Sequence, residues 1–291
     1  MSGKRDGLAR SVQMRIARHA KAIGVDPNLV LVRYAVERFL YRLSRSPHGD
    51  RFVLKGALLL LVWLGDTLRP TRDADLLAFG DLSGDGLAQI FGEICHVGVE
   101  PDAMTFLADT IRVAPIRLED DYGGHRVTLQ SRLGAARLRV QVDVGIGDIV
   151  TPEPAWLDYP SLLDLPRPRL RAYSRASVMA EKLHTVVVLG SVNSRMKDYF
   201  DLRALLRENA LSPGELERAL SATFERRRTA LPAGVPTGLT DEFARDASKQ
   251  SQWKAFLDKN RLEAPGLQEV VREIRDFIAG ALRAARKSGV L

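Results

Sequence analysis

The stretch that decides the fold is Arg69-Pro-Thr-Arg-Asp-Ala-Asp-Leu-Leu-Ala-Phe79. Its second half alternates enough to predict a β-strand, which Gly80-Asp81 ends. Asp73 and Asp75 lie at the start of that strand, and their spacing of two points both side chains to the same face. Two carboxylates this close repel each other, and a divalent cation relieves the repulsion. Because magnesium prefers hard oxygen ligands together with the phosphate oxygens of a substrate, the pair predicts a magnesium site.

A lone Asp-x-Asp pair also fits a solvated strand face, so the flanking sequence has to decide between the two. Upstream, Lys55-Gly56 lies within an apolar segment, residues 52–64, that predicts a short buried helix. A glycine at that place lets a phosphate approach backbone N–H groups and the positive end of a helix. We therefore expect Lys55 and Gly56 to contact a nucleotide.

A third acid, Asp143, lies on a second predicted strand over residues 136–144. There, apolar side chains alternate with a charged face that includes Asp143. If the two strands adjoin, three acids converge, which is enough to hold two metal ions that activate the attacking oxygen and stabilise the leaving pyrophosphate. The alternative is a surface acid paired with Arg137 or Arg139.

A further charged set lies on helices predicted over residues 177–189 and 197–208. Lys182 can neutralise the β- and γ-phosphates during phosphoryl transfer, and Arg195 can clamp the same oxygens. Asp198 can orient Lys182, help deprotonate the acceptor hydroxyl, or cap the second helix. His184, on the same helix as Lys182, is expected to pack rather than react.

The composition is that of a globular protein able to bury a full core, with 291 residues of which 45% are hydrophobic. Its longest apolar run, residues 58–64, is far shorter than the roughly 20 residues of a membrane helix, and the N-terminus lacks a signal-peptide core. A cytoplasmic location is therefore expected. The net charge of +7 is compatible with a polyanionic partner without requiring one. A single cysteine, Cys95, excludes disulfides and cysteine-cluster zinc sites and is expected to be buried.

The pattern along the chain predicts an α+β protein in two parts, residues 1–172 and 173–291. Helices are expected in the first part over residues 8–23, 29–43, 52–64 and 85–97, with hairpin strands over 110–118 and 125–131 around Asp121-Tyr-Gly-Gly. Five prolines between residues 152 and 168 mark a connection, and the boundary is placed near Ala172. The second part is expected to be helical over residues 177–189, 197–208, 212–228, 241–258 and 267–287.

The order of these motifs resembles the AbiEii/AbiGii-type nucleotidyltransferase toxins of type IV toxin–antitoxin systems, which include mycobacterial-type tRNA nucleotidyltransferase toxins. The resemblance covers roughly residues 34–206 and is carried by Lys55-Gly56, Arg69-Pro-Thr-Arg-Asp73-Ala-Asp75, Asp143, Lys182-Leu183 and Lys197-Asp198-Tyr-Phe-Asp201-Leu. It implies a polymerase-β-like core, a mixed sheet flanked by helices, followed by a helical C-terminal lobe, with the active cleft between them.

The resemblance also implies roles for residues. Asp73 and Asp75 match the metal-binding pair, Lys182 the nucleotide-contacting lysine, and Asp198 the essential downstream acid. Members of the family transfer a nucleotide from a nucleoside triphosphate, and some mycobacterial-type relatives modify the 3′ end of tRNA, which halts translation. A cognate antitoxin encoded nearby is the implied partner. The sequence departs from the pattern at Ala57, where serine or glycine is common and a serine hydroxyl contact is therefore lost.

Two exposed features have two interpretations each. A phosphate on Thr71 would bring about −1.5 to −2 charge beside the predicted metal site and would inactivate it, or Thr71 simply caps a turn. The basic run Arg226-Arg227-Arg228 either touches RNA or is a solvated helix end.

Other functions compete with RNA modification. The same fold could modify a protein or a small molecule, or the chain could be an inactive nucleotide- or RNA-binding module. Retention of Asp73, Asp75, Asp143 and Lys182 together favours an enzyme over the binding module. Serine-hydrolase elbows, dinucleotide loops, Walker loops and His-Glu-x-x-His zinc helices are all absent from the sequence.

Overall fold

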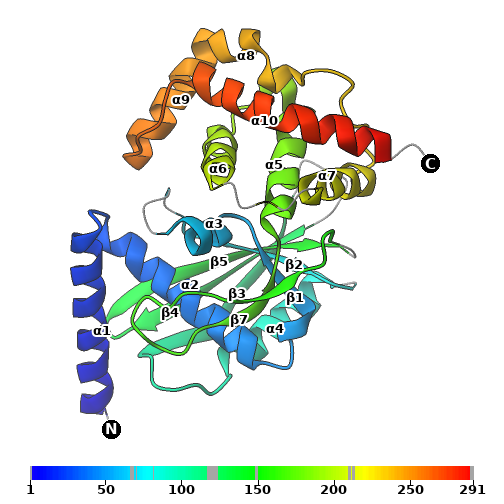
Figure 1. The fold of residues 1–291 in the computed structure, drawn as a ribbon. Helices are drawn as coiled ribbons and strands as arrows, with labels where there is room; N and C mark the ends of the chain where they lie inside the picture. The colour runs from blue at the N-terminus through cyan, green and yellow to red at the C-terminus, as the bar shows by residue number, and fades with distance from the viewer. Residues whose placement is uncertain are drawn as a thin grey trace. The chain divides into compact units, whose positions relative to one another are not determined.

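The computed structural model describes residues 2–65, 69, 71–80, 82–116, 124–147, 150–208, 211 and 214–288. The chain forms two compact units, shown in Figure 1. The first comprises Met1–Asp148 and Ala155–Ala172, and the second comprises Ile149–Pro154 and Tyr173–Leu291. The second unit thus takes in a short segment from within the proline-rich connection. The division into a core over residues 1–172 and a helical lobe over residues 173–291 stays a prediction.

The first unit is built on a seven-stranded mixed sheet of order β3-β4-β5-β2-β1-β7-β6. Strand β2 pairs in parallel with β5 and antiparallel with β1, and β1 pairs in parallel with β7. The strands are β1 (Phe52–Lys55), β2 (Ala74–Ala78), β3 (Met104–Ile116), β4 (Gly124–Leu133), β5 (Ala136–Ile146), β6 (Ala155–Asp158) and β7 (Arg169–Ala172). This mixed sheet with its helices confirms the predicted α+β class.

Four helices accompany the sheet: α1 (Ser2–Ala22), α2 (Pro27–Arg45), α3 (Ala57–Leu64) and α4 (Gly84–Cys95). Helix α2 begins as the sequence predicts, because the Asp26 side chain accepts a hydrogen bond from the Asn28 N–H and proline occupies the first turn. Helix α2 packs on β3, β5 and β7, and α4 packs on β3, β4 and α2 (Figure 1). The two helices therefore cover the same face of the sheet.

Buried ion pairs fix α2 to its surroundings. Arg42 bonds both oxygens of Asp102, with the shorter contact at 2.6 Å. Glu37 accepts hydrogen bonds from Arg38 and from the backbone N–H of Leu162. Because each buried charge has a partner of opposite sign or a backbone donor, α2 can be buried nearly all round.

Two predictions about the first unit need correction. The helix predicted over residues 52–64 is wrong at its start, because Phe52–Lys55 is strand β1. This strand lies inside the sheet and its first three residues are buried, so it lacks the alternation that separates strand from helix. Strands β6 and β7 lie where only a connection was expected. The predicted hairpin strands do pair, whereas the turn residues Asp121 to Gly123 lie outside the described residues.

The second unit is helical, as predicted. Its helices are α5 (Arg175–Leu189), α6 (Met196–Arg207), α7 (Glu215–Arg226), α8 (Asp241–Arg245), α9 (Ala247–Asn260) and α10 (Leu267–Ser288). The single helix predicted over residues 241–258 is two helices, because Asp246 leaves the helical conformation and caps α9 through the N–H groups of Ser248 and Lys249. The first two residues of the helix predicted over residues 212–228 lie outside the described residues, and Gly214 precedes α7.

Helix α10 closes the core of the second unit. It packs on α6, α7 and α8. Its buried residues recur every three or four positions, as an amphipathic helix requires: Leu267, Val270, Val271, Ile274, Ile278, Leu282 and Ala285. Within the described ranges, no helix combines the length and the apolar character needed to cross a bilayer.

Candidate functional site

Charged side chains form a row across four neighbouring strands of the first unit. Lys55 on β1 is the register partner of Asp75 on β2, and Asp75 is the partner of Asp143 on β5. Asp143 in turn lies opposite Arg126 on β4. Directly opposed residues on adjacent strands point to the same face, so two carboxylates lie side by side between a lysine and an arginine. The alternate residues of β5, such as Val142, are buried, which places the row on the face away from α2 and α4.

Gly56 shapes the space beside Asp75. Its φ of 73° lies in the left-handed region that favours glycine. A Cβ atom at this position would lie 2.1 Å from Oδ2 of Asp75, so a side chain here would displace the carboxylate. Gly56 is also the N-cap of α3, as the sequence predicts, and Ala57 follows it without a hydroxyl group. The carboxylate of Asp75 thus lies against the backbone where strand β1 turns into helix α3.

Asp143 is bound to Arg126 through a two-point ion pair. The Nε and Nη2 atoms of Arg126 donate to the two Asp143 oxygens at 2.8 and 2.7 Å. The partner suggested as an alternative from the sequence, Arg137 or Arg139, is therefore wrong, although an arginine pair does exist. The hydrogen bond that Arg126 donates to Asp143 raises the pKa of Arg126, and the charges of Asp143, Asp73 and Asp75 add to that effect. The Arg126 guanidinium thus lies in the field of all three acids.

The donor set has the chemistry that a hard divalent cation requires, because carboxylate oxygens are the preferred ligands of magnesium. Gly56 keeps the space beside Asp75 free of a side chain. Over the part of the chain that the structure describes, however, no three His, Cys, Asp or Glu side chains are grouped to hold a metal ion. Both Asp143 oxygens are bonded to Arg126, so a metal ion at Asp143 would have to compete with that guanidinium.

In the second unit, Lys182 on α5 is bound to two carboxylates of α6. Its Nζ atom lies 2.8 Å from Oδ1 of Asp198 and 2.7 Å from Oδ2 of Asp201. The other Asp198 oxygen accepts a hydrogen bond of 2.8 Å from Nε of Arg195. Both carboxylates are buried, and Lys182 is 12% exposed. The network therefore fixes the position of the ammonium group relative to α6.

The environment of Asp198 distinguishes among the three roles that the sequence allows, which are orienting Lys182, accepting a proton and capping the helix. Burial pushes its pKa upward, but the charges and hydrogen bonds of Lys182 and Arg195 outweigh burial and hold the pKa well below the usual range. A carboxylate so stabilised is a weak base, so the geometry favours orienting Lys182 over accepting a proton. The capping role is wrong, because Arg195 is the N-cap of α6 and Asp198 lies within its first turn.

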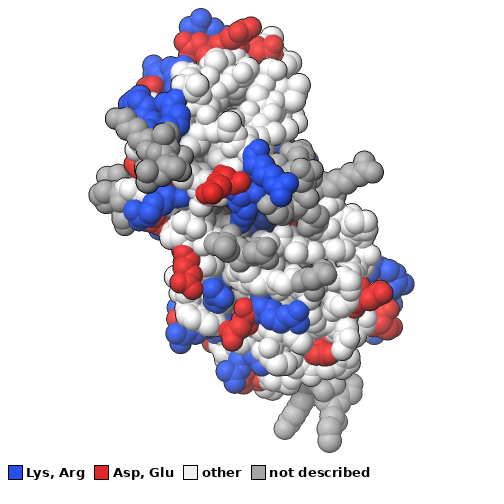
Figure 2. Space-filling model, turned by 90° about the vertical axis from the view of Figure 1, so that its right-hand side faces the viewer, with Lys and Arg blue, Asp and Glu red and all other residues white. Residues whose placement is uncertain are grey.

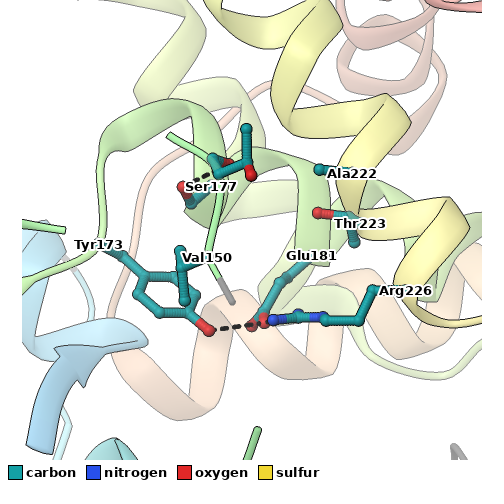
Figure 3. Close-up of a pocket in the computed structure, with 8 residues that line it drawn as sticks. Val150, Tyr173, Ser177, Glu181, Ala222, Thr223 and Arg226 are labelled. Carbon is teal, nitrogen blue, oxygen red and sulfur yellow. Dashed lines mark hydrogen bonds and ion pairs between the residues drawn. The ribbon is translucent and has the colours of Figure 1, made fainter. Parts of the chain in front are cut away.

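Glu181, the neighbour of Lys182, attaches α5 to α7. Figure 3 shows Tyr173 and Arg226 converging on its carboxylate. The Tyr173 hydroxyl donates to Glu181 at 3.2 Å and Arg226 donates at 3.1 Å. These groups border a small hollow, partly open to solvent, which is lined by Val150, Thr151, Tyr173, Ser177, Glu181, Ala222, Thr223 and Arg226. Consecutive residues of α5 are thus tied to α6 and to α7, which fixes the rotation of the helix that carries Lys182.

The basic run at the end of α7 differs from both interpretations of its sequence. The guanidinium groups of Arg226 and Arg227 turn inward to Glu181, at 3.1 and 3.5 Å. Arg227 also contacts Nδ1 of His184 at 3.0 Å, and His184 is fully buried against Phe224, in agreement with its predicted packing role. Only the third arginine of the run, at position 228, is exposed.

Three site residues escaped the sequence analysis in whole or in part. Arg126 belongs to the row only through strand register, which no local pattern reveals. Asp201 was noted beside Asp198, without its role as the second, fully buried partner of Lys182. Glu181 stands in the same helix turn as Lys182, and its partners come from Tyr173 and α7, so only the fold identifies its role.

Two other predicted positions are also located. Thr71 is half-buried, and its hydroxyl donates a long hydrogen bond of 3.5 Å to the carbonyl of Asp73. Cys95 is half-buried rather than buried, and burial raises the pKa of its thiol to about 11, so the thiolate is scarce at neutral pH. On the face drawn in Figure 2, basic and acidic side chains are interspersed and form no continuous basic field.

Comparisons with known proteins agree with this architecture. The family model of the nucleotidyl transferase AbiEii toxin of type IV toxin–antitoxin systems matches residues 38–277. The solved structure of MenT4, a nucleotidyltransferase toxin from Mycobacterium tuberculosis, has 18% identity and a TM-score of 0.55 over 94% of this chain and 98% of that chain. This likeness shows a shared fold.

Two solved structures from Helicobacter pylori are less similar. One is a protein described as a nucleotidyltransferase candidate, with 13% identity and a TM-score of 0.49 over 87% of this chain and 95% of that chain. The other is JHP933, with 14% identity and a TM-score of 0.48 over 86% of this chain and 90% of that chain. No curated protein matches the chain significantly.

Proposed function

The chain belongs to the AbiEii family of nucleotidyltransferase toxins of type IV toxin–antitoxin systems, and from this premise we propose that it transfers a nucleoside monophosphate from a nucleoside triphosphate to an RNA acceptor, the 3′ end of tRNA. The observation that carries the proposal is the row of Lys55, Asp75, Asp143 and Arg126 on one face of the sheet. Adjacent acids flanked by cations suit a substrate that brings both metal and phosphate.

Asp73 and Asp75 hold magnesium in this proposal, and Asp143 completes a two-ion site. When bound, magnesium neutralises the triphosphate and lowers the pKa of the attacking hydroxyl. Lys55 lies close to the same acids and binds phosphate oxygens by charge, while Gly56 leaves room for a phosphate at the start of α3.

The charged network of the second unit supplies the remaining phosphate contacts. Lys182 and Arg195 bind the triphosphate, and Asp198 orients both of them, which its lowered pKa supports. The 3′-hydroxyl oxygen forms a bond to the α-phosphorus while the bond from that phosphorus to the bridging oxygen breaks. Pyrophosphate leaves, and the hydroxyl proton passes to water, because both oxygens of Asp198 are already bonded to cations.

The RNA acceptor rests on family membership and on charge. The net charge of +7 favours a polyanion over a neutral small molecule. A tRNA whose 3′ end is blocked cannot be aminoacylated, so transfer there would stop translation. A cytoplasmic location and a cognate antitoxin, which need not form a stable complex, belong to the same proposal.

Phosphorylation of Thr71 is proposed as a means of inactivation. Its hydroxyl lies beside the backbone of Asp73, and a phosphate would add about −1.5 to −2 charge next to the acids of the row. That charge would compete for the metal and repel the triphosphate. Full transfer activity in a sample completely phosphorylated at Thr71 would reject this part.

The proposal is tested by incubating the purified protein with magnesium and each α-labelled nucleoside triphosphate in turn. Total tRNA and total cellular protein are offered as separate acceptors. Label on tRNA, from at least one nucleotide, is the expected result. Label on protein alone would move the acceptor to the protein-modifying alternative, and nucleotide binding without transfer to either acceptor would indicate a binding module.

A further inference from the structure

Arg126 occupies the carboxylate that a second metal ion would need. We propose that Arg126 competes with the divalent cation for Asp143, so that the protein without nucleotide presents a two-acid site and gains its third ligand only when the guanidinium leaves. The inference rests on the proposed function, because it takes Asp73 and Asp75 as metal ligands. It assigns Arg126 a positioning role that neither the sequence nor the family membership supplies.

The contact geometry places the two cations in competition for one carboxylate. Arg126 approaches both oxygens of Asp143, at 2.8 and 2.7 Å, in the two-point arrangement that is the strongest form of such a pair. A divalent ion bound to the same carboxylate would lie a few ångströms from the guanidinium, and the two positive charges would repel each other. Each cation therefore weakens the binding of the other at Asp143.

The positive charge of Arg126 also acts in place of the metal ion's charge, because it offsets the repulsion between the carboxylates. Asp75 and Asp143 are direct register partners, so their carboxylates repel each other without a positive charge nearby. The charges of Asp73 and Asp75, in addition to that of Asp143, stabilise the charged form of Arg126. The Arg126 guanidinium, together with Lys55 on the other side of Asp75, thus offsets repulsion that a metal ion would also relieve.

The fold permits the exchange without moving the backbone. Arg126 and Asp143 are held opposite each other by the β4–β5 ladder, so their Cα positions are fixed. The Arg126 side chain is 42% exposed, so its flexible stem can swing the guanidinium into solvent while Asp143, 21% exposed, stays in place. Only side-chain rotation is needed.

The test measures Mn²⁺ binding to the nucleotide-free protein. The readout is the electron paramagnetic resonance signal of unbound Mn²⁺, which falls as Mn²⁺ binds. Arg126→Gln removes the competing charge, and we expect it to tighten Mn²⁺ binding about tenfold, the effect of removing roughly one charge-assisted hydrogen bond. Arg126→Lys keeps the charge but loses the two-point geometry. Its Mn²⁺ affinity should lie between those of Arg126→Gln and the wild type. The matched control is Arg139→Gln, the same change at an exposed residue on β5.

A second comparison separates competition from a general charge effect. In an Asp143→Asn background, Arg126→Gln should leave Mn²⁺ binding unchanged, because the contested carboxylate is gone. Equal tightening by Arg126→Gln and Arg139→Gln, tightening that persists with Asp143→Asn, or weaker binding in Arg126→Gln would each overturn the inference. Circular dichroism confirms that each variant is folded.

Asp75→Asn distinguishes failure of this inference from failure of the proposed function. If Asp75→Asn abolishes Mn²⁺ binding while Arg126→Gln behaves like its control, the metal site stands and the competition is rejected. If Asp75→Asn leaves Mn²⁺ binding intact, the metal assignment itself fails, and the inference falls with it.

Discussion

Gly56 is as important to the candidate site as any charged residue, because it leaves room for the carboxylate of Asp75. Gly56→Ala should reduce nucleotide transfer at least about tenfold, because the new Cβ would lie 2.1 Å from Oδ2 of Asp75 and must displace that carboxylate. The backbone adds a penalty of about 1–3 kcal/mol, since a φ of 73° with a ψ of −152° is a combination that essentially only glycine adopts. Single-turnover transfer rates and thermal unfolding together separate the two effects.

Gly65→Ala is the matched control for that change. Gly65 flanks the other end of α3 and has a φ of 77°, but nothing lies within 4 Å of its Cβ position. It should lose similar stability and keep its transfer rate. Equal loss of transfer in both variants would show that backbone strain, and not the displacement of Asp75, is responsible.

Asp198 predicts a pH-dependent contribution to stability. Burial opposes its charged form, but Lys182 and Arg195 hold its pKa below the usual value. A lowered pKa in the folded state stabilises the protein at pH values above the unfolded pKa of about 3.9, and this contribution is lost as the pH falls from there toward the folded pKa. Asp198→Asn should therefore lower the free energy of unfolding by about 3 kcal/mol at pH 7. The effect should be about 1 kcal/mol smaller near pH 3, which is roughly one unit below the unfolded pKa.

Urea unfolding of wild type and Asp198→Asn at both pH values measures this difference. The control is Asp258→Asn, which removes an exposed partner of Lys254 and should change stability little at either pH. A gap between wild type and Asp198→Asn that is the same at pH 7 and pH 3 would contradict the lowered pKa.

Single residues also show how far sequence reasoning extends. The spacing of Asp73 and Asp75 predicts a shared face, because strand geometry fixes which side chains point together; in the structure Asp75 lies on β2 and Asp73 directly precedes it. Arg126 could not be predicted in this way, since it is 17 residues from Asp143 and meets it only through the β4–β5 register. The inward turn of Arg226 and Arg227 was hidden for a similar reason, because their partner Glu181 lies on another helix.

At the scale of elements, α5 is the part that positions Lys182. Glu181→Gln should weaken the attachment of α5 to α7, because a neutral amide binds Arg226 and Arg227 less strongly than a carboxylate does. We expect the free energy of unfolding to fall by about 1–3 kcal/mol. Urea unfolding measures the loss.

Glu225→Gln, at an exposed residue of α7, is the control and should be nearly neutral. If Glu181→Gln is as stable as this control, the attachment through Glu181 contributes nothing, and another contact must fix α5.

Elements with their own signals were predicted, and those defined by tertiary pairing were not. Helix α2 was recognisable from Asp26-Pro27, which caps and starts it. Strand β1 was mistaken for helix because burial on both faces removes the alternation of a half-exposed strand. Strands β6 and β7 are four residues each and pair across a proline-containing loop, so little in their sequence distinguishes them from a connection.

At the scale of the whole molecule, the family and the mixed fold follow from the ordered motifs and agree with the match over residues 38–277. Each unit holds a charged network, which in the first lies on the sheet around Asp75 and in the second on the helices around Lys182. Only part of each network could be predicted from the sequence, because some of the residues that bind its members lie on strands and helices distant in the sequence. The central functional claim is transfer of a nucleotide to the 3′-hydroxyl of RNA.

The most direct measurement of that claim is transfer of α-labelled nucleotide, with magnesium, to intact tRNA and to tRNA whose 3′-terminal diol has been destroyed by periodate. Wild-type protein should label intact tRNA only, and Asp75→Asn and Lys182→Ala should label neither. Labelling of the oxidised tRNA would contradict the 3′-hydroxyl as acceptor, and full activity of Asp75→Asn would contradict the site itself.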